Sequence, residues 1–231
     1  SRSQLLNVHT PELIDSLTTG LPRDLAESQG FPWNPRHFPA VCAVAGGMIA
    51  AVDAALADGV AGTLSTGFHH ARPDRGKGFC SVNGLALAAA HALTGGVESI
   101  LILDVDAHCG GGTALCIQGE RRIRHVDVSV NPFDRYTASD NSDLYMVDAG
   151  EDYLTWIEHS LESLDSSSDR FGLCIYNAGM DPFEGCPVGG LAGITSAMLA
   201  RREELVFHWC AERDIPIAFT IEGGYLGGRL E

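Results

Sequence analysis

Apolar residues along this chain alternate between helical spacing and short continuous runs rich in β-branched residues. Helical spacing between most of the runs predicts helices at Val82 to Leu93, Glu151 to Leu164 and Gly193 to Arg213. Strands joined by crossover helices indicate an α/β fold, a three-layer α/β/α arrangement around a mostly parallel, doubly wound sheet. The runs themselves predict buried strands at Gly62 to Thr66, Ser99 to Asp104, Ile123 to Val130, Gly172 to Asn177 and Ile215 to Ile221.

The beginning of the chain is predicted to be helical. Thr10 precedes a proline and a glutamate, a favourable helix start, so a helix is expected to run to about Leu17. The stretch from Phe38 to Leu56 is apolar on nearly all sides, which is typical of a helix packed against a sheet. Two glycines and Asp53 interrupt this stretch, so we expect no membrane-spanning segment.

Composition narrows the function further. The 231 residues contain no linker or repeat, so residues 1–231 are expected to form one domain. Lys+Arg 15 against Asp+Glu 30 gives a net charge of −15, which disfavours direct nucleic-acid binding and suits either a cationic substrate or a salt-adapted source. The seven cysteines form no Cys-x-x-Cys pair and indicate reduced thiols; with no readable secretory signal, a cytoplasmic location is expected.

Polar residues follow four predicted strands at their carboxyl ends, which meet along one edge of a parallel sheet. Because alternate residues of an extended segment share a face, Asp104, Asp106 and His108 are expected to point the same way. Together with Asp181, Asp106 and His108 would leave a fourth position open, as catalytic zinc requires. An acidic strand end neutralised by helix N-termini and solvent is the competing interpretation. The four segments are Gly67 to His70, Asp104 to His108, Asn177 to Asp181 and Glu222 to Tyr225.

Two carboxylate ligands would leave a metal-bound water less acidified than three histidines would, so a separate general base is needed. His69 and His70 can supply it, because imidazole titrates near neutrality. Tyr225 lies among glycines, which would let its hydroxyl approach a polarised carbonyl. Each signal is weak alone. The run Gly110 to Gly112 could suggest a phosphate loop, but no Gly-Lys-Ser/Thr follows it.

Taken together, the motifs resemble the histone deacetylase family, especially its bacterial acetoin-utilisation and acetylpolyamine-type members on the arginase/deacetylase fold. The resemblance implies that Asp106, His108 and Asp181 bind zinc, with Fe2+ as an alternative metal. It implies that His69 and His70 act as acid and base, that Tyr225 polarises the acetyl carbonyl, and that Asp104 orients His69 and lines a structural potassium site with Ser129. The motifs are Leu103 to His108, Gly67 to Ala71 with Gly78 to Asn83, Asn177 to Pro182, and Glu222 to Tyr225.

The resemblance also implies a narrow channel for an acetylated amine, either acetyl-lysine or an acetylated polyamine. Either Phe133 or Tyr136 could form the opposite wall, because the stretch Pro132 to Asp140 departs from the family's pattern. The residues expected to line the channel are Gly78, Phe79, Gly223 and Gly224.

Other departures bear on activity. The family usually has His-His-Gly-Asp-Gly or His-His-Gly-Asn-Gly after the metal strand, whereas this chain has Cys109 and Gly111 there. His70 is therefore expected to lack the polar partner that orients it and to be a weaker base. No aspartate stands in Phe31 to Phe38, where many members grip the substrate backbone. The chain is also expected to be incomplete at both termini.

The expected reaction is hydrolysis of an N-acetyl amide. Water activated by the metal would attack, His70 would take its proton, Tyr225 would hold the oxyanion and a histidine would protonate the amine. A ureohydrolase resembling arginase would need two manganese ions, but Gly110 and Phe183 stand where further acidic ligands would be expected. An inactive or fragmentary metal-binding or acyl-lysine-binding domain is the third alternative. The sequence leaves a homo-oligomer open.

Overall fold

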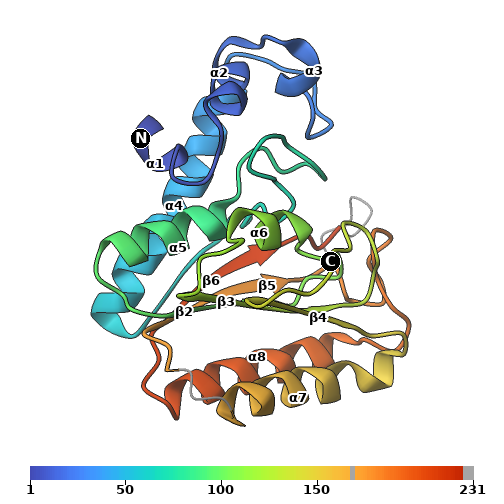
Figure 1. Cartoon of the computed structure of the whole chain (residues 1–231). Coiled ribbons are helices and arrows are strands. Elements are labelled where there is room, and N and C mark those ends of the chain that lie inside the picture. The colour runs from blue at the N-terminus through green and yellow to red at the C-terminus, as the bar shows by residue number, and fades with distance from the viewer. Residues whose placement is uncertain (167–169, 226–231) are drawn as a thin grey trace.

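The computed structural model describes residues 1–166 and 170–225, whose strands form a six-stranded sheet. Neighbouring strands run parallel in the order β1-β6-β5-β2-β3-β4. Helices cover both faces of this sheet (Figure 1), so the predicted three-layer α/β fold is confirmed. The strands are Val60–Thr63 (β1), Ile100–Asp104 (β2), Ile123–Ser129 (β3), Ser142–Met146 (β4), Leu173–Gly179 (β5) and Ile217–Glu222 (β6).

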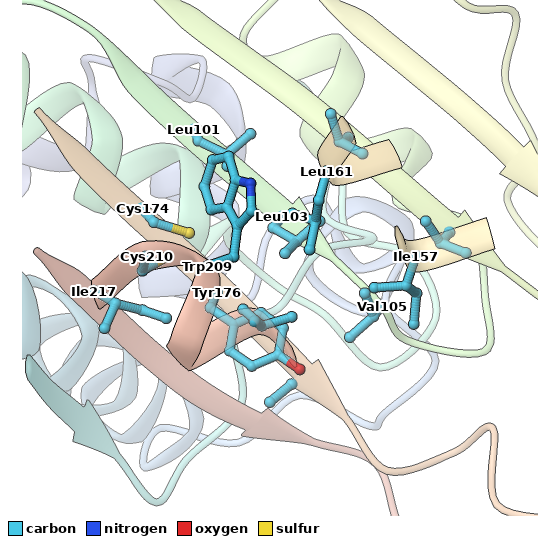
Figure 2. Close-up of a cluster of buried hydrophobic side chains, with 14 of the residues drawn as sticks. Leu101, Leu103, Val105, Ile157, Leu161, Cys174, Tyr176, Trp209, Cys210 and Ile217 are labelled. Atoms are coloured by element: carbon cyan, nitrogen blue, oxygen red, sulfur yellow. The ribbon is translucent and has the colours of Figure 1, made fainter. Parts of the chain in front are cut away.

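Apolar clusters hold a pair of helices on each face of the sheet. Helices α4 (His37–Asp58) and α5 (Gly84–Thr94) cover one face, and α7 (Tyr153–Ser166) and α8 (Ser196–Ala211) cover the other (Figure 1). Figure 2 shows the second interface, where strand residues meet side chains of α7 and α8. The helices are thereby fixed against the strands whose ends carry the polar motifs. The labelled side chains of this cluster include Leu101, Leu103, Tyr176, Ile157, Leu161 and Trp209.

Three short helices precede α4: α1 (Arg2–Leu5), α2 (Pro11–Thr19) and α3 (Arg23–Ala26). The hydroxyl of Thr10 accepts the backbone N–H of Leu13 at 3.3 Å, so the predicted helix cap is confirmed. By length and composition α4 is apolar enough to cross a membrane, a test that the core helix of a globular protein also passes, so the prediction of no membrane-spanning segment stays a prediction. One face of α4, including Met48 and Val52, is buried against α5 and the sheet.

Several predicted boundaries were wrong. The first strand covers Val60–Thr63 and not Gly62 to Thr66, because it pairs with β6 from Val60 opposite Ile217 to Thr63 opposite Thr220. Leu64, predicted inside that strand, is 87% exposed. Strand β4 was missed; it is a short edge strand whose last four residues are only partly buried. The short helix α6 (Gly111–Cys116) was also missed.

The order in which strands are added to the sheet reverses between the neighbouring strands β2 and β5. From β2 the chain proceeds outward to β3 and β4, whereas from β5 it proceeds the other way to β6. In an open α/β sheet the crevice for a ligand lies beyond the carboxyl ends of the strands at such a reversal. Asp104 at the end of β2 lies opposite Asn177 of β5, so the polar motifs after these two strands emerge side by side.

Candidate active site

A three-residue cluster suited to a metal lies beyond this reversal. Asp106 and His108 follow β2, and Asp181 follows β5; one ligand atom from each lies within 4.8 Å of the others. Both carboxylates are buried, and 11% of the His108 side chain is exposed. Oδ1 of Asp106 accepts the backbone N–H of His108 at 2.9 Å, but its buried Oδ2 has no hydrogen-bond partner. An unpartnered buried carboxylate oxygen is costly unless a cation balances it, so these residues fit a divalent metal.

A cavity of about 460 Å³ opens onto these three residues. It would give a substrate access to the fourth coordination position of a metal held there. The cavity combines a charged floor with aromatic and aliphatic walls. Its lining includes His69, His70, Gly78, Phe79, Asn131, Phe133, Pro187, Val188, Glu222, Gly223 and Tyr225, as well as the three cluster residues.

His69 is held by a strand-borne carboxylate. Its Nδ1 donates to Oδ2 of Asp104 at 2.8 Å, and Oδ1 of Asp104 accepts the side-chain amide of Asn177 at 2.9 Å. Burial lowers the pKa of His69, but the charges of Asp104, Glu222 and Asp106 outweigh burial and raise the pKa well above its usual value. The structure thus places Asp104 where the resemblance implied an orienting residue.

His70 also contacts a carboxylate, contrary to the prediction that it lacks an orienting partner. Its Nδ1 lies 3.2 Å from Oδ2 of Asp134, in the loop after β3. Burial and the charge of His69 lower the pKa of His70 to about 4, although Asp134 acts in the opposite direction. Sequence reasoning missed Asp134; the departure of Pro132 to Asp140 from the family's pattern was the signal that could have drawn attention to it.

The loop that carries Asp134 packs against Gly111, the position at which the family's usual motif has a polar side chain. A Cβ at this position would lie 2.2 Å from the backbone oxygen of Asp134, so the loop occupies the space that an aspartate would need. The next glycine, Gly112, would place a Cβ 2.3 Å from the backbone of His70. The glycine run therefore allows close backbone approach at the start of α6.

Tyr225 lines the cavity from the loop after β6, and 45% of it is exposed. Burial and the charge of Asp181 raise its pKa to about 12, so the phenol keeps its proton near neutral pH and can donate it in a hydrogen bond. Gly223 has φ of +70° and sits against the Asp181 carboxylate, where a Cβ would be 2.2 Å from Oδ1. Gly224 was predicted to line the channel but does not line this cavity; its N–H donates to Asp181 at 2.6 Å.

Aromatic side chains form two sides of the cavity. Phe79 and Phe133 both line the cavity, and the ring of Phe133 lies edge-on to His70 with centroids 4.9 Å apart. Tyr136, the other candidate for the second wall, stacks on His125 at 5.8 Å and donates to the carbonyl of Asp143. Its ring lies outside the cavity lining, so Phe133 forms that wall.

A second group of buried oxygens lies behind the first. Asp127 of β3 is opposite Asp104, and the hydroxyl of Ser129 donates to its Oδ1. Burial and the charge of Asp104 raise the pKa of Asp127 well above its usual value. Sequence reasoning named Asp104 and Ser129 but missed Asp127, a polar residue within an apolar strand. Carboxylate and hydroxyl oxygens suit a hard cation; potassium there stays a prediction.

The sequence is similar to histone deacetylases over nearly its whole length. The model of the histone deacetylase domain matches residues 1–230. A protein of Picosynechococcus sp. without a described function is 34% identical over 97% of this chain and 76% of its own length. Histone deacetylase 2 of Arabidopsis thaliana is 31% identical over 78% of this chain and 48% of its own length. This chain therefore matches about half of that plant protein.

Solved structures show the same fold. A crystal structure of an HDAC homolog complexed with SAHA matches with a TM-score of 0.84, covering 96% of this chain and 66% of that chain at 19% identity. Acetylpolyamine aminohydrolase from Burkholderia pseudomallei matches with a TM-score of 0.80, covering 97% of this chain and 78% of that chain, also at 19% identity. At such identities these matches establish the fold alone.

Proposed function

Because this chain belongs to the histone deacetylase family, we propose that it hydrolyses N-acetyl amides with a divalent metal, zinc or alternatively Fe2+, held by Asp106, His108 and Asp181. The observation that carries the proposal is the arrangement of these three residues at the floor of a cavity lined by two histidines and a tyrosine. Its chemistry matches what amide hydrolysis requires: an electrophile site, a base, an acid and an oxyanion donor.

The two histidines and Tyr225 perform the steps that this chain can supply. A divalent ion bound here would supply Lewis acidity, polarising the acetyl carbonyl and acidifying water. Neutral His70 accepts the proton of the attacking water through the ring nitrogen that Asp134 leaves free. His69, whose protonated form is stabilised by Asp104, donates a proton to the departing amine. Tyr225 donates its hydroxyl to the developing oxyanion.

The walls of the cavity support a substrate with a slender aliphatic chain. Phe79, Phe133 and Val188 offer apolar surface that would pack against the methylene groups of an acetyl-lysine side chain. The acidic residues of the lining are Asp106, Asp181 and Glu222, and all three are buried at the floor. No lining carboxylate of the described residues therefore stands at the mouth to favour the second amine of an acetylated polyamine.

The alternatives receive less support. A dinuclear ureohydrolase needs further acidic ligands, and within residues 1–166 and 170–225 the cluster of Asp106, His108 and Asp181 is the one group of this kind with ligand atoms so close. An inactive binding domain would not need the histidine–carboxylate pairs or the tyrosine that the cavity contains.

The test is turnover by the purified chain after metal removal and after reloading with zinc. We expect release of acetate from an acetyl-lysine peptide only in the zinc-loaded protein, and slower turnover of an acetylated polyamine. Faster turnover of the polyamine would correct the substrate class. Metal-loaded, folded protein that hydrolyses neither substrate would contradict the proposed function.

A further inference from the structure

We infer that Asp134 is the positioning residue of His70 and supplies, from a different segment of the chain, the polar partner that the family's usual motif would place at Gly111. This inference rests on the proposed function and adds a residue to its machinery. The sequence departs from the family's pattern at two places near His70, glycine at 111 and the stretch Pro132 to Asp140. In the fold these departures occupy the same space.

The backbone around Asp134 aims its side chain into the site. Asp134 has φ of +59°, in the left-handed region that aspartate and asparagine enter more easily than most residues. The preceding residue, Phe133, accepts the N–H of Cys109 at 3.0 Å, which ties the loop to the segment that carries His108. The Asp134 side chain is fully buried. The loop and the Asp134 carboxylate are therefore fixed relative to the cluster of Asp106, His108 and Asp181.

The contacts of Asp134 require a carboxylate. Oδ2 lies 3.2 Å from Nδ1 of His70 and accepts the backbone N–H of Gly112 at 3.2 Å. Oδ1 accepts from Arg72 at 2.8 Å and from Lys77 at 2.5 Å. The backbone N–H of Gly112 and the side chains of Arg72 and Lys77 can only donate, so an acceptor is needed on both sides. An amide has one oxygen and could satisfy one side only.

This arrangement determines which nitrogen of His70 carries the proton. A carboxylate accepts and cannot donate, so Nδ1 of His70 must be protonated to hydrogen-bond with it. The lone pair is then on Nε2, which is the nitrogen available to take a proton from water in the cavity. Burial raises the pKa of Asp134, but hydrogen bonds from His70, Lys77 and Arg72 outweigh burial and hold it at about 2, so the acceptor stays ionised.

The same contacts connect the orientation of His70 to both channel walls. Lys77 directly precedes Gly78 and Phe79 of one wall and lies 5.1 Å from the ring centroid of Phe133 on the other. Lys77 is the sole lysine of the chain. Its ion pair with Asp134 therefore joins the loop that carries the first wall to the loop that carries the second.

Two substitutions test the assignment. In Asp134→Asn the amide oxygen would face the cations and the NH2 group would face His70, which would move the ring proton from Nδ1 to Nε2. Asp134→Gly keeps a residue that accepts positive φ and removes both acceptors. Asp165→Asn is the matched control, because Asp165 is ion-paired with Arg213 on the surface, away from the cavity.

The tautomer of His70 is read from long-range proton–nitrogen NMR spectra of the histidine rings. For each variant, kcat, KM and zinc content are also measured. For both Asp134 variants we expect kcat to fall about 10²-fold or more, as for a displaced general base, with zinc content kept and KM changed far less. Nδ1 protonation should be lost in Asp134→Asn and become mixed in Asp134→Gly, while Asp165→Asn resembles wild type.

Wild-type kcat in either zinc-loaded Asp134 variant would overturn the inference, and so would an unchanged His70 tautomer in both. The NMR readout needs no turnover. If the wild-type protein hydrolyses no acetylated substrate, the proposed function fails, and the tautomer still decides whether Asp134 positions His70.

Discussion

The two histidines of the site contact carboxylates that come from differently built regions. The partner of His69 is Asp104, the last residue of the buried strand β2, where hydrogen bonds to Asn177 and to the backbone of Asp106 add to the sheet. The partner of His70 is Asp134, in a loop, neutralised by two cations from another loop. A strand end places a side chain by regular geometry, whereas the loop needs a set of individual contacts that must all be present.

This contrast predicts that the loop side can be altered while the strand ends keep their capacity to bind the proposed metal. In Tyr225→Phe, the hydroxyl that would meet the oxyanion is removed, and none of the three side chains of the proposed metal site is changed. We expect kcat to fall about 10²–10³-fold, the usual effect of removing one oxyanion donor, with zinc content unchanged. Steady-state kinetics with metal analysis checks this. Undiminished kcat would exclude Tyr225 from the mechanism.

The packing of the loop against Gly111 can be tested by filling the space between them. Gly111→Ala would put a Cβ 2.2 Å from the Asp134 backbone, so we expect the free energy of unfolding to fall by about 1–3 kcal/mol, as in other overpacked sites. Gly46, in α4, is the control, because a Cβ there meets nothing within 4 Å. Gly46→Ala should stabilise by about 0.5–1 kcal/mol. Equal stabilisation by both changes in denaturant unfolding would show that the loop is not packed on Gly111.

The smallest expected effect is on the pH dependence of the free energy of unfolding, which distinguishes the contribution of the Asp134 charge from that of its size and shape. Because hydrogen bonds from His70, Lys77 and Arg72 outweigh burial and lower its pKa to about 2, the stability it adds is complete above the unfolded pKa near 4. That stability is lost as pH falls towards 2. Between about pH 6 and about pH 3 we expect the difference in unfolding free energy between wild type and Asp134→Asn to narrow by about 1 kcal/mol. A difference independent of pH would mean that Asp134 is not held ionised.

The same contrast explains what could be predicted from sequence. That Asp106, His108 and Asp181 lie together could be predicted because parallel strands end at one edge, a rule that needs only the order of strands and the alternation of side chains. The boundaries of β1 were wrong because its pairing with β6, more than 150 residues later, sets its ends. Edge strand β4 was missed because it is short and mostly only partly buried, and its polar residues Ser142 and Asp143 lie at its start.

Asp134 could not be predicted from local pattern. Its contact with His70 joins residues 64 positions apart, and its importance depends on a side chain that Gly111 lacks. The choice between Phe133 and Tyr136 also needed coordinates, because only the fold shows that Tyr136 stacks on His125. Sequence reasoning thus located the strand-borne half of the site and left the loop-borne half incomplete.

The measurement that tests the central claim most directly is zinc binding by wild type and by Asp181→Ala, with folding checked by circular dichroism. We expect wild type to bind one zinc ion at the cluster of Asp106, His108 and Asp181, and the variant to bind at least about 10²-fold more weakly, because it loses one of three protein ligands. Stoichiometric zinc of wild-type affinity in folded Asp181→Ala would contradict the assignment of the metal site and, with it, the proposed mechanism.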